Sequence, residues 1–118
     1  HTGPAMGGQS FEYADLKGDF FGGRAKTNDD NGLMNFTKKE TDKHRFRVPT
    51  LRNVELTWPY MHDASAQTLE EAITKMYHYQ LGYDKLDKTE VRLLVAFLKT
   101  LTGEYQGKPV RGEVCPAP

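Results

Sequence analysis

A methionine and a histidine have the most distinctive chemistry among the side chains of this sequence. Met76 stands in an apolar pattern, where a methionine most often fills a core, but a buried thioether on a helix is also a soft ligand for haem iron. His62 lies between Met61 and Asp63, so it could be a core histidine held by a carboxylate or a residue that lines a cofactor pocket. Residue type and spacing leave both interpretations open for each side chain.

Zinc, EF-hand and thiol sites are disfavoured by spacing. The four histidines are separated by 43, 18 and 16 residues, so no pair has the spacing of zinc ligands. The DDNG sequence at 29–32 resembles an EF-hand loop, but aligning its glycine to the loop places Thr27 and Lys38 where acidic ligands are required, and we expect a turn. The single cysteine, Cys115, excludes an internal disulfide and a Cys-x-x-Cys metal site, and we interpret it as an exposed spare thiol.

The composition is that of one small domain. The 118 residues carry 16 basic and 16 acidic side chains, and this zero net charge argues against nucleic-acid binding, which requires a basic surface. No run approaches the roughly 20 apolar residues that span a bilayer, so we expect no membrane segment. The sequence opens with His1 and shows no signal peptide, which suggests a processed product or a piece of a longer chain.

The C-terminal third predicts two helices, the first over about residues 68–81. The TLEE sequence at 68–71 is a capping box, in which the threonine is the expected N-cap and the second glutamate is expected to bind back to the N-cap N–H. Apolar residues then follow at helical spacing as far as Tyr77. The helix should end by Gly82, because glycine readily adopts the left-handed conformation that terminates a helix.

The second predicted helix covers about residues 88–102. Asp87 is its expected N-cap, and Glu90 completes a second capping box. An apolar stripe follows along the helix, and Gly103 stands where a left-handed C-terminal cap is expected.

The remaining residues show no regular pattern, so the predicted fold class is all-α with a long loop-rich N-terminal segment. The predicted domain, 1–104, begins with a glycine-rich wrapping segment over 1–45 and continues with a motif loop over 46–66, in which the aromatic stretch 57–63 is expected to be buried and irregular. Within that loop, Pro49 is expected to begin a short helical run. Residues 105–118 are predicted to be an extended tail. Aromatic side chains of the wrapping segment are expected to pack on something large and flat: Phe11, Tyr13, Phe20 and Phe21.

Five stretches of the sequence resemble one protein family. RVPTLRNVELT at 47–57 and PYMHD at 59–63 are similar to the signature of the bacterial dihaem cytochrome c peroxidases. TLEEA at 68–72 and LVAFLKTLTG at 94–103 resemble the closing helices of that family. HTGPAMGG at 1–8 resembles the residues around the end of its second haem-attachment motif. The resemblance implies that nearly the whole chain is a cytochrome c-like haem domain.

The resemblance also implies the ligands of a c-type haem. The histidine of the family's Cys-x-x-Cys-His motif corresponds to His1, and its distal methionine corresponds to Met76, 14 residues after His62. Met6 and Met61 are the competing methionines. His62 is similar to a histidine that lies near the haem in a tuning or structural role. The two attachment cysteines would precede His1, and this sequence does not contain them.

The function implied by the resemblance is that of the C-terminal, high-potential haem domain of a periplasmic enzyme that reduces hydrogen peroxide to water. Its partners would be the N-terminal peroxidatic haem domain and an electron donor, either a small cytochrome c or a cupredoxin, and a homodimer is compatible with the resemblance. Members of the family also bind calcium between their two domains. The backbone carbonyls that hold it correspond to Thr57 and Pro59, and a further ligand comes from the other domain.

Two other functions stay open at this point. One is the dihaem enzyme of methylamine utilisation, whose distal ligand is a tyrosine. Met76 disfavours this enzyme, although Tyr77 and Tyr79 stand nearby. The other is a haem-free fragment with a structural or interaction role, which the missing attachment cysteines favour.

Overall fold

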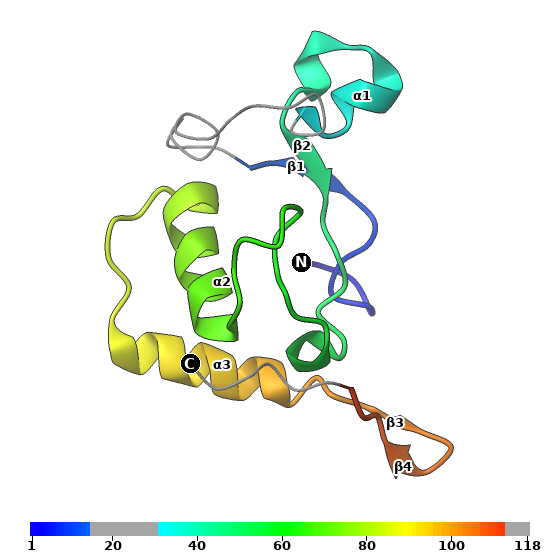
Figure 1. The fold of residues 1–118 in the computed structure, drawn as a ribbon, viewed down its shortest axis with the longest axis vertical. Coiled ribbons are helices and arrows are strands. Elements are labelled where there is room, and N and C mark those ends of the chain that lie inside the picture. Colours follow the sequence, from blue (N-terminus) through cyan, green and yellow to red (C-terminus); the bar gives the residue numbers. More distant parts are fainter. Residues whose placement is uncertain (15–30, 113–118) are drawn as a thin grey trace.

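A computed structural model describes residues 1–14 and 31–112 of the chain (Figure 1). Several residues of the sequence hypotheses lie outside these ranges, namely Phe20, Phe21, Thr27, Asp29, Asp30 and Cys115. The elements in chain order are β1 (Phe11–Tyr13), α1 (Met34–Thr37), the 3-10 helix η2 (Glu40–Asp42), β2 (Arg45–Arg47), the 3-10 helix η3 (Val54–Leu56), α2 (Leu69–Lys75), the π-helix η4 (Met76–Gln80), α3 (Lys88–Lys99), β3 (Glu104–Tyr105) and β4 (Lys108–Pro109).

The expectation of an all-α fold is wrong, because the described residues also contain β-structure. β1 pairs with β2 in an antiparallel ribbon, with Glu12 opposite Phe46, and β3 pairs with β4 in a second ribbon. These strands are two or three residues long, too short to show an alternating pattern, and β1 and β2 lie far apart in the sequence. Both ribbons therefore depend on contacts that sequence periodicity does not report.

α2 and η4 follow each other directly and lie within the first predicted helix. Thr68 is the N-cap, and its hydroxyl oxygen accepts a hydrogen bond from the N–H of Glu71 at 3.2 Å. The Glu71 carboxylate accepts from the N–H of Gln67 at 2.7 Å, so the return bond of the capping box forms one residue earlier than predicted. Gly82, with a φ of +75°, follows the end of the helical segment.

α3 begins as predicted but ends differently. Asp87 caps its N-terminus, and the Glu90 carboxylate accepts from the N–H of Asp87 at 3.3 Å. Gly103 is not among the glycines with positive φ, so the predicted left-handed cap is wrong. Its N–H instead donates to the side-chain oxygen of Asn53 at 2.8 Å. The last carbonyls of α3 accept instead from the N–H groups of residues 100–102, three positions further on.

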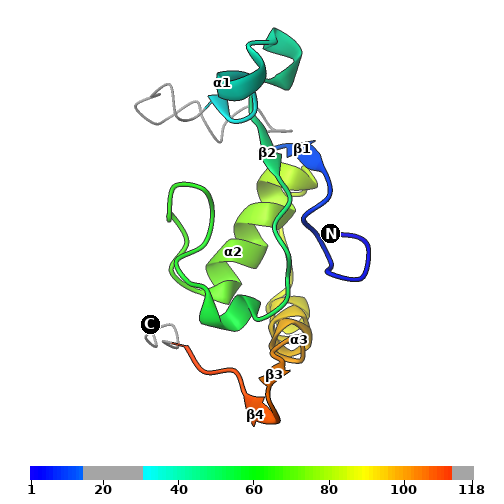
Figure 2. The ribbon, with the colours of Figure 1, turned by 90° about the vertical axis from the view of Figure 1, so that its right-hand side faces the viewer.

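Two segments far apart in the sequence lie side by side in the N-terminal half. We call residues 1–8 the opening segment and residues 47–52 the motif strand, of which Arg47 alone belongs to β2. The N–H of Gly8 donates to the carbonyl oxygen of Val48 at 2.6 Å. Figure 2 shows the opening segment on one side of the motif strand and the loop of residues 57–66 on the other. The motif strand thus lies between the opening segment, with His1 and Met6, and the loop of residues 57–66, with Met61 and His62.

The helical run expected at Pro49 does not form. Residues of the motif strand bind the opening segment, and the first helical turn after them is η3. Asn53, with a φ of +57°, is the N-cap of that turn. The chain then passes through a cis peptide bond between Trp58 and Pro59.

The buried core is small and lies where the loop of residues 57–66 meets α2 and α3. Tyr60 and Ala66 exchange backbone hydrogen bonds of 2.8 and 3.3 Å across this loop. Both are buried, together with Leu69 of α2 and Val95 of α3. Half-buried apolar residues surround these four, namely Val54, Trp58, Met61, Ala72, Ile73, Val91 and Leu98. Of the stretch 57–63 that was expected to be buried, Tyr60 alone is buried, and Thr57, Pro59, His62 and Asp63 are exposed, so the expectation is wrong for most of the stretch.

Many large apolar side chains of the described residues are exposed. Large exposed apolar surface usually marks a site for a ligand or another polypeptide. No helix in the described part of the chain is long and apolar enough to cross a membrane. The exposed set comprises Phe11, Tyr13, Phe36, Met76, Leu81, Tyr83, Leu93, Leu94, Phe97 and Tyr105.

Candidate functional site

The imidazole ring of His1 is held by two backbone carbonyls. Its Nδ1 lies 3.0 Å from the oxygen of Pro49 and 3.2 Å from the oxygen of Met6. A carbonyl oxygen can only accept a hydrogen bond, so Nδ1 carries the proton and donates it. In the neutral ring Nε2 then has the free lone pair, which is the form that a metal-ligating histidine requires. The ring is therefore held in the tautomer that binding through Nε2 requires, and the assignment of His1 as a ligand stays a prediction.

Backbone hydrogen bonds hold the Met6 carbonyl, one of the two acceptors, and close the opening segment. The N–H of Leu51 donates to the oxygen of Met6 at 3.2 Å, and the N–H of Gly7 donates to the oxygen of Thr2 at 2.9 Å. The opening segment is thus a tight turn closed on itself and attached to the motif strand. Its closure brings His1 to Pro49, although the two are far apart in the sequence.

Gly7 makes this close approach possible. It has a φ of +139°, a conformation that side-chain-bearing residues rarely adopt. A Cβ atom at this position would lie 1.9 Å from the oxygen of Pro49, the same atom that accepts from His1. The absence of a side chain at Gly7 is therefore part of the geometry of the His1 site.

Met76 is not core filler. It continues the apolar face of α2, on which Leu69, Ala72 and Ile73 pack in or against the core. Met76 stands past the end of that core, as the first residue of η4, and is 39% exposed. The Met76 side chain is therefore accessible to a cofactor from outside the core. A methionine that binds haem iron must be accessible in this way before the cofactor covers it.

The π-helical turn that begins at Met76 is a second unusual feature of this region. The N–H of Leu81 donates to the oxygen of Met76 at 3.3 Å, five residues back. Such turns are rare and occur frequently at functional sites. The next residue, Tyr77, contacts Tyr83 with ring centroids 5.1 Å apart, which links the start of the turn to the residues that follow it.

The competing methionines have other surroundings. Met61 is half-buried and packs against the core, so its side chain is already in apolar contact. Met6 lies in the opening segment, and its carbonyl accepts from the ring of His1. Of these three methionines, Met76 is the one that is exposed. The assignment of Met76 as a ligand stays a prediction that this exposure favours.

His62 is a surface residue rather than a core histidine. It is exposed, and its ring stacks on that of Phe46 with a centroid separation of 4.4 Å and an angle of 29°. The core-histidine interpretation is therefore wrong. A role beside a cofactor is still a prediction, in which Phe46 of β2 would fix the orientation of the ring.

The two residues predicted to offer carbonyls to calcium are both exposed, one on each side of Trp58. Thr57 is fixed by its N–H and its hydroxyl, which donate to the oxygen of Val54 at 3.2 and 3.1 Å. Pro59 follows the cis bond. Within residues 1–14 and 31–112 no group of three or more His, Cys, Asp or Glu side chains gathers as a metal site. Calcium at these carbonyls stays a prediction.

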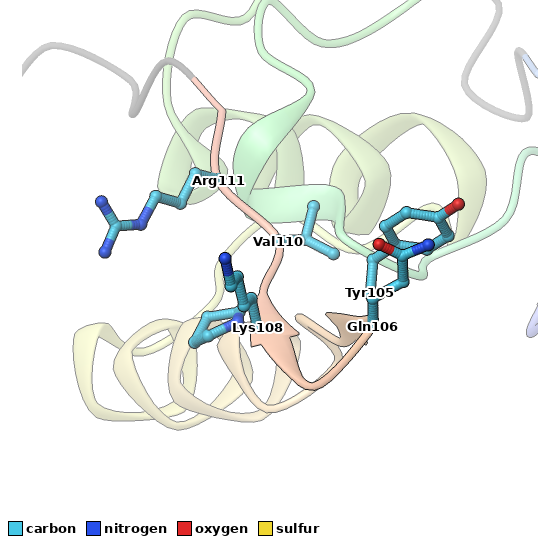
Figure 3. A pocket seen from close by; sticks show the side chains of 6 residues that line it. Tyr105, Gln106, Lys108, Val110 and Arg111 are labelled. Atoms are coloured by element: carbon cyan, nitrogen blue, oxygen red, sulfur yellow. The ribbon is translucent and has the colours of Figure 1, made fainter.

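A separate depression of about 550 Å³ lies on the β3–β4 hairpin. Figure 3 shows Tyr105 and Gln106 at one side of it and Lys108 and Arg111 at the other. None of the candidate haem or calcium ligands lines it. This depression is thus distinct from the candidate site.

Sequence reasoning missed the residues that hold His1. Neither Gly7 nor the carbonyl of Pro49 was assigned a role, because a pairing between residues 1–8 and 47–52 has no local signature. Two signals pointed to it without identifying it: the cluster of glycines near the N-terminus and the RVPTLR sequence of the motif strand.

The chemistry of the two candidate ligands fits a haem. The chain offers an imidazole with Nε2 free, an accessible thioether and exposed aromatic side chains such as those of Phe11 and Tyr13. An imidazole and a methionine sulfur form one of the known axial ligand pairs of c-type haem.

Comparison with known proteins agrees with this chemistry. No protein-family model matches the chain. Cytochrome c551 peroxidase of Nitrosomonas europaea is 47% identical over 104 residues, which are 88% of this chain and 30% of that protein. Cytochrome c peroxidase Ccp of Escherichia coli is 48% identical over 105 residues, which are 89% of this chain and 22% of that protein. A solved MauG-like protein associated with microbial copper homeostasis has a TM-score of 0.61 and 33% identity, with 88% of this chain and 37% of that chain covered.

The ligand chemistry and these similarities define a peroxidase-related haem domain. The chain belongs to the bacterial dihaem cytochrome c peroxidase family. It spans less than a third of the length of the two peroxidases just described.

Proposed function

We propose that this chain is the electron-transfer haem domain of a periplasmic cytochrome c peroxidase, in which His1 and Met76 would bind the haem iron. The whole enzyme would reduce hydrogen peroxide to two water molecules with two electrons and two protons. A small cytochrome c or a cupredoxin would supply the electrons. This domain would receive each electron and pass it to a peroxidatic haem in the N-terminal domain.

The observation that carries the proposal is the hydrogen bond from His1 Nδ1 to Pro49, at 3.0 Å. It fixes one tautomer and one orientation of the ring and leaves Nε2 for iron. An ordinary surface histidine has no need of a backbone acceptor from a segment 48 residues away in the sequence. The closure of the opening segment around this bond is what a ligand role explains.

The second ligand sets the direction of electron flow. When bound, haem supplies a one-electron couple between ferric and ferrous iron. A thioether such as that of Met76 is a neutral, soft ligand that favours the ferrous state and raises the reduction potential. A domain with a raised potential accepts electrons from a donor, which suits a receiving role. Leu81 and Tyr83 are exposed and follow Met76 closely in the sequence. Their side chains would exclude water once the site is covered.

Calcium, location and assembly follow from the same proposal. The carbonyls of Thr57 and Pro59 would bind calcium at the boundary with the peroxidatic domain, and carbonyl oxygens are suitable ligands for that ion. Attachment of c-type haem in this family implies the periplasm. Docking of the electron donor would be weak and transient, as redox encounters usually are. A homodimer is compatible with this arrangement.

A dihaem enzyme of the methylamine-utilisation type is the second candidate, since the solved neighbour is named MauG-like. In that enzyme class a tyrosine takes the place of the methionine ligand. Tyr77 and Tyr79 are half-buried, and the ring of Tyr77 already contacts Tyr83. Met76 is more exposed and therefore favours the peroxidase. The haem-free interaction role is the third candidate, and the fixed tautomer of His1 disfavours it.

The proposal is tested by the ferric spectrum of the full-length protein. Met76→Ala is expected to abolish the methionine-to-iron charge-transfer band and leave the far-ultraviolet circular dichroism nearly unchanged, because Met76 lies outside the core. Met34→Ala, a half-buried methionine of α1, is the matched control and should keep the band. If Met76→Ala keeps the band, the ligand assignment is wrong. Loss of the band in Met61→Ala or Met6→Ala would transfer the role to that residue.

A further inference from the structure

The motif strand holds the opening segment with two side chains as well as with its backbone. The hydroxyl of Thr50 donates to the oxygen of Ala5, and Nη2 of Arg52 donates to the oxygen of Pro4 at 2.9 Å. Both side chains are exposed, where water competes for each bond, so neither bond contributes much to the free energy of folding. Their consequence is to fix where residues of the opening segment lie.

The positions that these side chains fix are those that hold the proposed ligand. Pro4 and Ala5 directly precede Met6, whose oxygen is one of the two acceptors of His1 Nδ1. Thr50 directly follows Pro49, whose oxygen is the other acceptor. A shift of the opening segment along the motif strand would therefore lengthen the bonds to the His1 ring.

We propose that Thr50 and Arg52 are positioning residues for His1. They set the strength of the hydrogen bonds that His1 Nδ1–H donates, and thereby the reduction potential of the haem. This inference rests on the proposed function, since it needs His1 to bind iron. A histidine that donates its Nδ1–H to a good acceptor is a more electron-rich ligand through Nε2. Such a ligand stabilises ferric iron more than ferrous iron and lowers the potential. Weakening the hydrogen bonds from Thr50 and Arg52 to the opening segment therefore raises the reduction potential.

The test is the midpoint potential of this domain's haem in the full-length holoprotein. Thr50→Val keeps the shape of the side chain and removes the donor, whereas Thr50→Ser keeps the hydroxyl. Thr100→Val is the matched control, because its exposed hydroxyl also donates to a carbonyl, that of Phe97 at 2.6 Å, on α3. A threefold to tenfold change in the relative affinity of the ring for ferric and ferrous iron raises the potential by about 30 to 59 mV for one electron. We expect such a rise in Thr50→Val and none in Thr50→Ser or Thr100→Val.

Arg52→Met removes the second donor, keeps an unbranched apolar stem and provides an independent variant if Thr50→Val does not assemble with haem. It should raise the potential in the same direction. An unchanged potential in Thr50→Val and Arg52→Met would overturn the inference, and so would an equal rise in Thr100→Val. A failure of the proposed function is distinguishable, because it appears as an unaltered charge-transfer band in Met76→Ala. Magnetic circular dichroism without a histidine signature in the wild-type haem would refute both.

Discussion

Gly7→Ala is the substitution with the largest expected effect, because Gly7 lies against the atom that holds His1. The new Cβ would lie 1.9 Å from the oxygen of Pro49 and 2.6 Å from its carbonyl carbon, whereas real Cβ contacts are essentially never shorter than 3.0 Å. The two segments must therefore move apart. The backbone strain at a φ of +139° costs of the order of 1–3 kcal/mol, and loss of the adjacent Gly8 to Val48 bond costs about 1 kcal/mol. We expect a total destabilisation of about 3 kcal/mol.

Gly82→Ala is the control that separates backbone strain from collision. Gly82 also has positive φ, +75°, but nothing lies within 4 Å of its ideal Cβ position. Its substitution should cost about 1 kcal/mol, since left-handed strain of 1–2 kcal/mol is partly offset by the lower entropy of the unfolded chain. The measurement is urea unfolding of the full-length protein, followed through the methionine charge-transfer band as a local probe. Equal unfolding midpoints for Gly7→Ala and Gly82→Ala would refute the close approach between Gly7 and Pro49.

Two further substitutions test the helix start and the core. Thr68→Ala removes the N-cap that accepts from Glu71 and should lower the free energy of unfolding by about 1 kcal/mol, whereas Thr68→Ser should recover most of it in the same urea assay; no loss in the alanine variant would exclude the cap. Tyr60→Phe removes a hydroxyl that donates to Val54 at 3.0 Å beside the core and should cost roughly 1 kcal/mol in thermal unfolding. An unchanged melting temperature would show that water replaces this bond without loss.

The parts of the fold that could be predicted are those whose signals lie within a few residues of each other. Asp87 and Glu90 form their capping box within one turn of helix, so the start of α3 was readable from the sequence. Gly103 failed as a left-handed cap for the opposite reason. The last carbonyls of α3 already accept from the N–H groups three residues further on, and the N–H of Gly103 donates to Asn53, a partner 50 residues away, so no left-handed cap forms.

The candidate site likewise has parts that the sequence could predict and parts that it could not. Resemblance alone pointed to His1, and the bond to Pro49 now gives that residue a physical reason to act as a ligand. The position of Met76 at the end of an apolar stripe was visible in the sequence, but its exposure was not, because exposure depends on where the core ends. The stacking of His62 on Phe46 likewise joins two residues that no local pattern pairs.

The motif that carries the resemblance joins the two ends of the described fold. Its first half, the motif strand, binds the opening segment. Its second half binds the end of α3: the N–H of Asn53 donates to the oxygen of Leu101 at 3.0 Å, and the hydroxyl of Thr102 donates to Glu55.

This double attachment has a consequence for the two proposed ligands. α3 packs against α2, and α2 leads directly into Met76. One continuous stretch of nine residues, 47–55, therefore helps to fix the positions of both His1 and Met76, although these two lie 75 positions apart in the sequence. An iron site requires its two ligands to be held at a fixed separation. A single stretch that fixes both sides of the site explains why the motif is so long although neither ligand belongs to it.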